Sequence, residues 1–434
     1  MAKIRRSVKN FLKSVIRFFF PNYLLWRLRL RRRRCIRENS VLSTDELLLL
    51  AEKQRPPRKN GLELIGFLTH ELGIGQSARL TAKCLDTVPE LPWEGYNFTV
   101  GIASRSGDHT LDGRLSNRIR YNVSLLCINA AELHMALTHL PLPVLGTYRI
   151  GMWYWELEDF PAMWDPAFAL VDELWAPTHF IESCLKKKAS CPVVYMPNCI
   201  AMDPPPAELD RKHFSLPEDA FLFLSMYDHF SSAQRKNPTG AIRAFQQAFS
   251  PEDRSVGLVL KVNNIKPDSE EIRALKELCG EYKNIYFIVG TLSRPEVNAL
   301  LKACDAAVSL HRSEGLGLLC QEAMLLGKPV IATAWSGNMD FTREDNSCLV
   351  GYDFVTLEEE IGPYPKGARW AEPHIEEAAA YMARLTQEKA YYRRIAAAGR
   401  RTMEEEYSPA VCGQRMAARL QQILEDPKNK KKLD

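Results

Sequence analysis

The sequence predicts an α/β protein made of two doubly wound domains that face each other across a cleft, preceded by a basic amphipathic segment. Three observations support this prediction. Short apolar stretches with strand character alternate with helical stretches in two successive series, a proline-rich segment separates the series, and the first 37 residues have a charge pattern unlike the rest. Strands that alternate with helices indicate parallel βαβ units, which build doubly wound sheets.

Size and charge agree with a multidomain globular protein. The chain has 434 residues, 46% apolar and 25% charged, which predicts two or three domains rather than one core. The net charge is +4, but residues 1–37 hold thirteen Lys or Arg and no acid, so the remainder carries −9. A nucleic-acid enzyme would need basic charge across its body, and we therefore expect no nucleic-acid partner.

The leader, residues 1–37, predicts contact with a membrane surface. Apolar side chains recur at helical spacing between Ile4 and Phe19, with Arg and Lys between them. The apolar run is too short and too charged to span a bilayer, which needs about 20 apolar residues. Pro21 is expected to kink or end this helix, and Tyr23 and Trp26 are candidate interfacial anchors. We expect monotopic binding to anionic lipid.

Two other interpretations of the leader stay open. It is also typical of a solvated or nucleic-acid-binding basic arm, and of an organelle transit peptide, because such peptides are rich in arginine and poor in acids. A secretory signal is disfavoured because no apolar region followed by small residues is present. The eleven cysteines never form a CxxC pair, so no metal or redox spacing appears, and reduced thiols in a cytoplasmic protein are expected.

The first series of elements follows the leader and linker, which together cover residues 1–60. It defines a first domain over residues 61–205, with expected strands at 62–68, 123–130, 144–155 and 172–178, and expected helices at 73–88, 130–140 and 179–190.

The second series begins after the proline-rich segment 197–220, which is the expected hinge because its prolines can continue neither element. It predicts a second domain over residues 206–394, with strands at 221–228, 256–264, 284–290, 305–311 and 328–333, and helices at 237–249, 269–279, 293–304 and 316–327. A helix over 395–425 is expected to pack back on the first domain, and 426–434 reads as a basic, frayed tail.

Two glutamates lie eight residues apart in SEGLGLLCQEAMLLGKPVIAT, which runs from Ser313 to Thr333. Glu314 is expected in a loop at the carboxyl end of a strand, where ligands of open parallel sheets bind. Glu322 lies about five residues into the next helix, roughly 7 Å along it. Vicinal ribose hydroxyls would compensate its burial by donating two hydrogen bonds. The alternative is structural. Glu322 is then a helix glutamate with a partner inside the protein, and Glu314 is a capping acid at the start of the helix.

This stretch resembles the signature of the retaining glycosyltransferases of family four, the group one transferases with the GT-B architecture of two Rossmann-like domains and an interdomain cleft. In that family the first glutamate contacts the transferred sugar and the second contacts the ribose, which implies these roles for Glu314 and Glu322. The resemblance places Gly315, Leu316 and Gly317 against the donor, although Leu316 stands where an aromatic residue is usual. Glycines also let a ligand approach the backbone, and the helix start attracts phosphate.

The resemblance covers residues 61–425 and includes two further segments. ELGIGQSARL is similar to the first-domain glycine loop that faces the diphosphate, which implicates Gly73 and Gly75. SAQRKNPTGAIRAF is similar to the segment whose basic residue binds donor phosphate, which implicates Arg235 or Lys236. Cations at strand ends above a cleft suit a diphosphate leaving group, and the plain alternative is solvated surface charge.

Four more residues complete the predicted site. Lys261, at the end of an apolar run, is a further phosphate candidate, and Ser336 and Asn338 are candidate hydrogen-bonding groups near the donor, although a plain turn explains them equally. Glu156, in GMWYWELEDFPAMW, stands where relatives often carry a catalytic-site histidine. The tryptophans around it suit either sugar stacking or a core strand.

The resemblance implies transfer of a hexose, with mannose as one candidate, from a nucleoside diphosphate sugar to a saccharide or lipid-linked acceptor, with retention at the anomeric carbon. The nucleotide sugar is a substrate, and no cofactor or metal is expected. The implied setting is surface polysaccharide or lipopolysaccharide assembly, on the cytoplasmic face of the cell membrane. The alternative is a non-catalytic membrane-associated scaffold with the same fold. A dehydrogenase is disfavoured because GIGQSA departs from GxGxxG.

Overall fold

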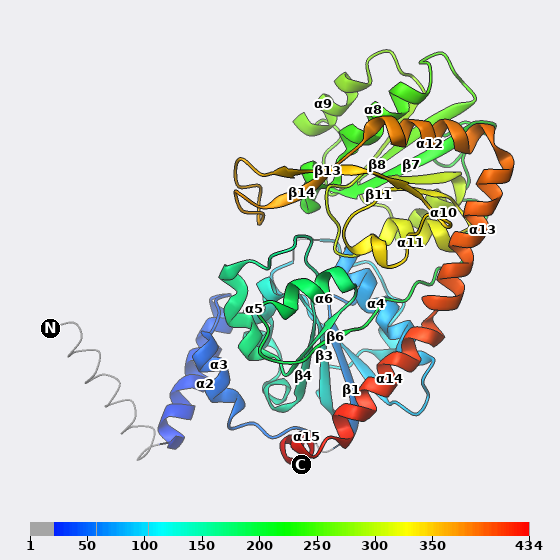
Figure 1. Cartoon of the computed structure of the whole chain (residues 1–434). Helices are drawn as coiled ribbons and strands as arrows, with labels where there is room; N and C mark the ends of the chain where they lie inside the picture. Colours follow the sequence, from blue (N-terminus) through cyan, green and yellow to red (C-terminus); the bar gives the residue numbers. More distant parts are fainter. Residues whose placement is uncertain (1–20, 58, 103, 434) are drawn as a thin grey trace.

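The computed structural model describes residues 21–57, 59–102 and 104–433, and it contains two six-stranded sheets (Figure 1). All strand pairs in both sheets are parallel. The first sheet has the order β2-β1-β3-β4-β5-β6, and its strands are β1 Lys59–Gly66, β2 Trp93–Asn97, β3 Tyr121–Cys127, β4 Tyr148–Met152, β5 Glu173–Ala176 and β6 Val193–Tyr195. The second has the order β12-β11-β10-β7-β8-β9, and its strands are β7 Phe221–Asp228, β8 Val256–Asn263, β9 Ile285–Val289, β10 Ala306–Ser309, β11 Val330–Thr333 and β12 Cys348–Val350.

Helices cover both faces of each sheet, as expected for buried parallel strands. Those of the amino-terminal half are α2 Pro21–Arg37, α3 Thr44–Ala51, α4 Gly73–Asp86, α5 Ala130–His139 and α6 His179–Lys186. Those of the second half are α7 Ala233–Lys236, α8 Pro238–Ala248, α9 Glu270–Cys279, α10 Arg294–Ala303, α11 Leu318–Leu325, α12 Ile375–Gln387, α13 Lys389–Glu406, α14 Pro409–Glu425 and α15 Pro427–Leu433. Short 3-10 helices are η1 Asp112–Arg114, η2 Leu142–Gly146, η3 Ala162–Leu170, η4 His229–Ser231 and η5 Gly337–Asp340.

The first domain begins earlier than residue 61. Leu28 of α2 and Leu47 and Leu50 of α3 are buried in the same core as β1, β3 and β5. The boundary was misplaced because the apolar stripe of an amphipathic helix does not reveal which surface covers it. The predicted amphipathic helix before Pro21 lies outside the described residues. None of the helices that the structure does describe has the length and hydrophobicity needed to cross a bilayer.

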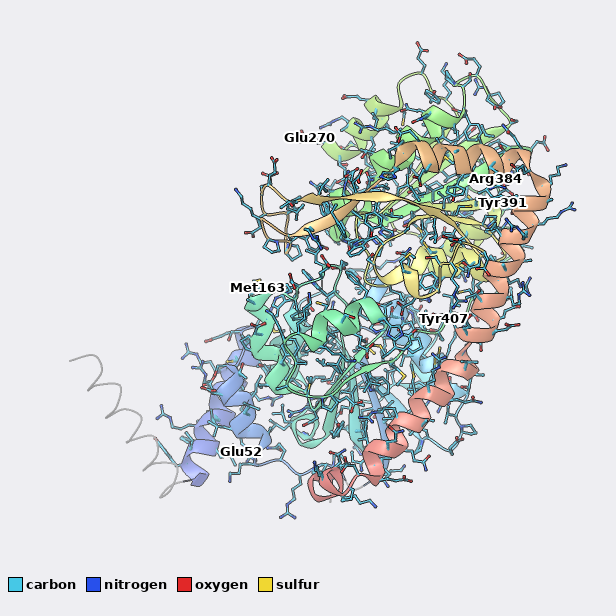
Figure 2. All side chains as sticks on the ribbon, in the orientation of Figure 1. Glu52, Met163, Glu270, Arg384, Tyr391 and Tyr407 are labelled. Carbon is cyan, nitrogen blue, oxygen red and sulfur yellow. The ribbon has the colours of Figure 1, made fainter. Side chains whose placement is uncertain are left out.

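Among the described residues, two segments connect the domain of the first sheet to that of the second, and these two connections lie side by side. The segment after β6 makes the first, and the junction of α13 with α14 makes the second, where the Ile200 N–H donates to the Tyr407 carbonyl at 2.8 Å. Figure 2 shows Tyr407 at this junction. Gly413 of α14 packs against α4, because a Cβ there would lie 2.5 Å from the Cys84 carbonyl oxygen. The return to the first domain thus starts near residue 407 rather than 395, and residues 427–433 of the expected tail form α15.

A two-stranded antiparallel hairpin leaves the second domain beside the second sheet. Its strands are β13 Tyr352–Thr356 and β14 Arg369–Pro373. Figure 1 shows it on the side of the molecule opposite α13 and α14, above α5 and α6 of the first domain. The sequence did not predict this element.

Candidate functional site

The loops at the carboxyl ends of the two sheets meet between the domains. The loop after β4 carries Trp155 and the loop after β10 carries Gly315, and a Cβ on Gly315 would lie 2.9 Å from the Trp155 carbonyl oxygen. The Thr178 hydroxyl, after β5, donates to the Gly315 carbonyl at 2.9 Å. This closeness explains the glycine, because a side chain at 315 would push the domains apart.

Four predicted residues come together at this junction. The Arg235 guanidinium lies 3.3 Å from the Glu314 carboxylate and 3.6 Å from the carboxylate of Glu156 in the first domain. The Lys236 ammonium forms a second ion pair with Glu314. Arg235 and Glu314 are buried, whereas the side chains of Lys236 and Glu156 stay 21% and 24% exposed. These two are therefore the groups that an entering substrate can reach first.

The cations determine the charge of the buried carboxylate. Burial alone would raise the pKa of Glu314, but Lys236 and Arg235 outweigh it and lower that pKa to about 2. Burial alone would likewise lower the pKa of Arg235, and Glu156 and Glu314 raise it instead. Glu314 and Arg235 are therefore both ionised at neutral pH.

The backbone around Glu314 is fixed by the loop after β11. The Glu314 N–H donates to the Ser336 hydroxyl at 2.8 Å. The side-chain amide of Asn338 donates to the Thr333 carbonyl at 3.0 Å, and Asn338 is fully buried. Ser336 and Asn338, the two residues predicted to bind the donor, thus form hydrogen bonds inside the protein. These bonds hold the Glu314 loop in its conformation. Leu316 of this loop is buried.

The second predicted carboxylate lies in α11, behind Gly317, which begins the helix with a φ of 91°. Glu322 is 1% exposed, and its carboxylate lies 2.6 Å from the guanidinium of Arg294 in the first turn of α10. Burial raises the pKa of Glu322, and Arg294 opposes that rise only in part. Arg294 was missed in the sequence, although its place just after a strand was an available signal.

Three other predicted residues lie apart from the Glu314 cluster. Gly73 and Gly75 are in the first turn of α4, and a Cβ on Gly75 would lie 2.6 Å from the His70 carbonyl oxygen, so only glycine fits there. Lys261 is fully buried, and its ammonium donates to the Gly290 carbonyl at 2.9 Å. Burial lowers the pKa of Lys261 to about 8. The ammonium therefore has a partner inside the second domain, and a role for Lys261 at the donor phosphate stays a prediction.

The cluster also contains a tyrosine that no sequence pattern indicates. Tyr364, from the loop of the β13–β14 hairpin, is 4% exposed, and its hydroxyl donates to the Glu156 carboxylate at 3.3 Å. No His, Cys, Asp or Glu group within the described ranges is arranged to hold a metal ion.

Comparisons with known proteins place this site in context. Residues 208–402 match the sequence model of the family described as glycosyl transferases group 1. No curated protein matches the chain. HepE from Anabaena, solved with UDP and glucose, is 14% identical, with a TM-score of 0.59 over 84% of this chain and 100% of that chain. Sucrose-phosphate synthase from Thermosynechococcus elongatus is 15% identical, with a TM-score of 0.59 over 84% of this chain and 99% of that chain. These structural likenesses show a shared two-domain fold.

Proposed function

We propose that this chain is a group 1 glycosyl transferase that transfers a hexose with retention. The match of residues 208–402 to that family and the GT-B fold of the whole chain support the proposal. The donor is a nucleoside diphosphate sugar and the acceptor is a hydroxyl on a saccharide or lipid-linked saccharide. One observation carries this proposal. The family motif supplies Glu314, the preceding segment supplies Arg235 and Lys236, and the other domain supplies Glu156, all within one ion-pair cluster.

The chemistry needs one bond broken and one formed. The bond between the anomeric carbon and the phosphate oxygen breaks, a bond from that carbon to the acceptor oxygen forms, and the leaving phosphate takes the acceptor proton. Charge grows on the phosphate oxygens, where Lys236, Arg235 and the start of α11 after Gly317 stabilise it. Glu314 would contact the sugar and Glu322 the ribose. Because both carboxylates hold internal cations here, the donor must exchange places with these pairs.

A panel of donors tests the proposal. UDP, GDP, ADP and dTDP are compared for their effect on the melting temperature, because a ligand that binds only the folded state stabilises it. UDP-glucose, UDP-N-acetylglucosamine, GDP-mannose and ADP-glucose are then assayed for release of nucleoside diphosphate. We expect one nucleotide to stabilise the protein and Glu314→Ala and Glu322→Ala to weaken binding or turnover. A folded protein that neither binds nor cleaves any donor would leave the scaffold alternative.

The surface of α2 favours a membrane setting for this reaction. Tyr23 and Trp26 are 50% and 56% exposed, their rings stack at 5.9 Å, and Leu30 on the same side of the helix is 42% exposed. Arginines surround this aromatic face, which suits the headgroup region of an anionic bilayer. The proposed setting is therefore the inner face of the cell membrane, where surface polysaccharide or lipopolysaccharide is assembled on lipid.

Vesicle binding tests this membrane contact. We expect Tyr23→Ala with Trp26→Ala to weaken co-sedimentation with phosphatidylglycerol vesicles while leaving donor hydrolysis unchanged. Phe230→Ala is the control, because Phe230 is 70% exposed on η4. Equal binding by both variants would show that α2 is not the contact.

A further inference from the structure

The β13–β14 hairpin is anchored to the loop that carries Glu314. The Ala371 N–H of β14 donates to the Arg312 carbonyl at 2.8 Å, and the Arg312 guanidinium forms an ion pair with Glu372. The same guanidinium lies 5.6 Å from the centre of the Trp370 ring. Movement of the hairpin is thereby coupled to the backbone two residues before Glu314.

The far end of the hairpin is built into the first domain. Leu357 and Tyr364 are 5% and 4% exposed within the aromatic core of that domain, and the Tyr364 and Trp155 ring centres are 5.5 Å apart. Arg369 adds an ion pair with Glu158 at 2.8 Å. The hairpin therefore spans the gap and belongs to both domains.

A tight turn presents Tyr364 to the cluster. The N–H of Ile361 donates to the Tyr364 carbonyl at 2.9 Å, and the reverse bond is 3.0 Å, with Gly362 at a φ of 58° between them. The Arg235 guanidinium lies 5.9 Å from the centre of the tyrosine ring. Burial raises the pKa of Tyr364, so its hydroxyl keeps its proton and donates to Glu156.

The charge balance of the cluster explains why an uncharged hydrogen-bonding group, the Tyr364 hydroxyl, is useful beside Glu156. Arg235 and Lys236 balance Glu156 and Glu314, and Arg235 is shared between the two carboxylates. A donor diphosphate brings further negative charge and competes for Arg235. When the phosphate takes the guanidinium, the Tyr364 hydroxyl remains to hold Glu156 in place.

We infer that Tyr364 is a positioning residue that holds the Glu156 carboxylate against a substrate hydroxyl while Arg235 serves the diphosphate, an inference that rests on the proposed function. The ring of Tyr364 joins the hairpin to the first domain, and its hydroxyl orients Glu156. The variant Tyr364→Phe separates these two roles, because it keeps the ring and its contact with Trp155 but removes the hydroxyl that bonds to Glu156.

The experiment measures donor hydrolysis, with water as the acceptor, for the four nucleotide sugars of the panel. We expect Tyr364→Phe to lower kcat about tenfold, which corresponds to about 1.4 kcal/mol, because Glu156 loses the hydrogen bond that orients its carboxylate. The KM for the donor and the melting temperature should stay close to those of the wild type. Tyr392→Phe is the matched control, because its hydroxyl donates to the Asp305 carbonyl, away from the cluster.

A double variant separates positioning from a general effect on structure. Glu156→Ala should lose activity, and adding Tyr364→Phe to it should cost nothing further, because the hydroxyl would have no carboxylate left to hold. The inference is overturned if Tyr364→Phe behaves like Tyr392→Phe, or if the two losses multiply. A wild-type protein that cleaves no donor would overturn the proposed function itself, and the inference with it.

Discussion

Glu314 and Glu322 come from one motif and are both buried, yet their pKa values shift in opposite directions. Glu314 has two cations beside it, and its pKa falls to about 2. Glu322 has one, Arg294, and its pKa is raised because burial outweighs a single ion pair. For these two buried carboxylates, the number of neighbouring cations therefore determines the direction in which the pKa shifts.

The two surroundings also differ in what they connect. The cations of Glu314 reach a carboxylate of the other domain, through Arg235 and Glu156. Arg294 and Glu322 both belong to the second domain and join α10 to α11. The ion pairs of Glu314 therefore depend on how the two domains are placed relative to each other, whereas the ion pair of Glu322 lies within one domain.

The largest expected effect comes from removing one cation from Glu314. In Lys236→Ala that carboxylate keeps a single arginine, as Glu322 does, and the leaving phosphate loses a stabilising charge. We expect kcat to fall on the order of 100-fold, or about 3 kcal/mol. Lys302→Ala, an exposed lysine on α10, is the control for donor turnover. Near-normal turnover in Lys236→Ala would remove Lys236 from the catalytic assignment.

The charge of Glu314 also gives a pH signature. Because its pKa in the folded protein is about 2, below the ordinary 4.5, its ionisation stabilises the fold above pH 4.5 and that contribution disappears as the pH falls toward 2. The contribution is about 3 kcal/mol. We expect the free energy of unfolding of Glu314→Gln to approach that of the wild type between pH 5 and pH 3. Urea unfolding measures it, with exposed Glu358→Gln as the control.

Glu322→Gln should show the opposite sign. The folded pKa of Glu322 is raised, so wild-type stability is complete below pH 4.5 and decreases as the pH rises through the folded pKa. The neutral glutamine avoids that decrease. The variant should therefore gain stability relative to the wild type on going from pH 4 to pH 8, in the same urea experiment. A change parallel to that of Glu314→Gln would contradict the comparison.

The smallest effect is expected at Lys261. Glu314 and Glu322 form ion pairs with their neighbouring cations, whereas the buried Lys261 ammonium is bonded to a backbone carbonyl. Its folded pKa of about 8 lies below the ordinary 10.5, so protonation below pH 8 costs stability that Lys261→Met recovers. The lost bond to Gly290 offsets this gain, and we expect a change within about 1 kcal/mol. Nucleotide affinity, measured by calorimetry, should stay unchanged. A large loss of affinity would instead support the predicted role of Lys261 as a phosphate ligand.

The sequence predicted the elements that are continuous along the chain. The alternation of strands and helices predicted both sheets, which the structure confirms, and the strand, loop and helix around Glu314 follow one another within 30 residues. Arg235 and Lys236 were implied by the resemblance of their segment to the family, and they also follow the carboxyl end of a strand, β7. Such positions follow from local order in a parallel sheet.

Features set by tertiary contacts could not be predicted in this way. Lys261 lies in a strand whose two faces are both covered, and its alternation with Leu260 and Val262 did not show where its ammonium would go. Residues 357–368 have no periodicity, so nothing indicated that Tyr364 would return to Glu156. For Ser336 and Asn338 the sequence left two interpretations open, contact with the donor or a plain turn, because a loop sequence does not reveal which way its polar groups point.

The paired crossings at Ile200 and Tyr407 have a mechanical consequence. Two adjacent chain segments act as a hinge. The simplest relative motion of the domains is therefore a rotation about this hinge, and the displacement grows with distance from it. The hairpin lies on the opposite side (Figure 1), so the Arg369–Glu158 pair should separate more than the Lys83–Asp203 pair. Spin labels at the two pairs would measure the change in distance across each pair when the domains rotate. Equal changes at both pairs would exclude this hinge rotation.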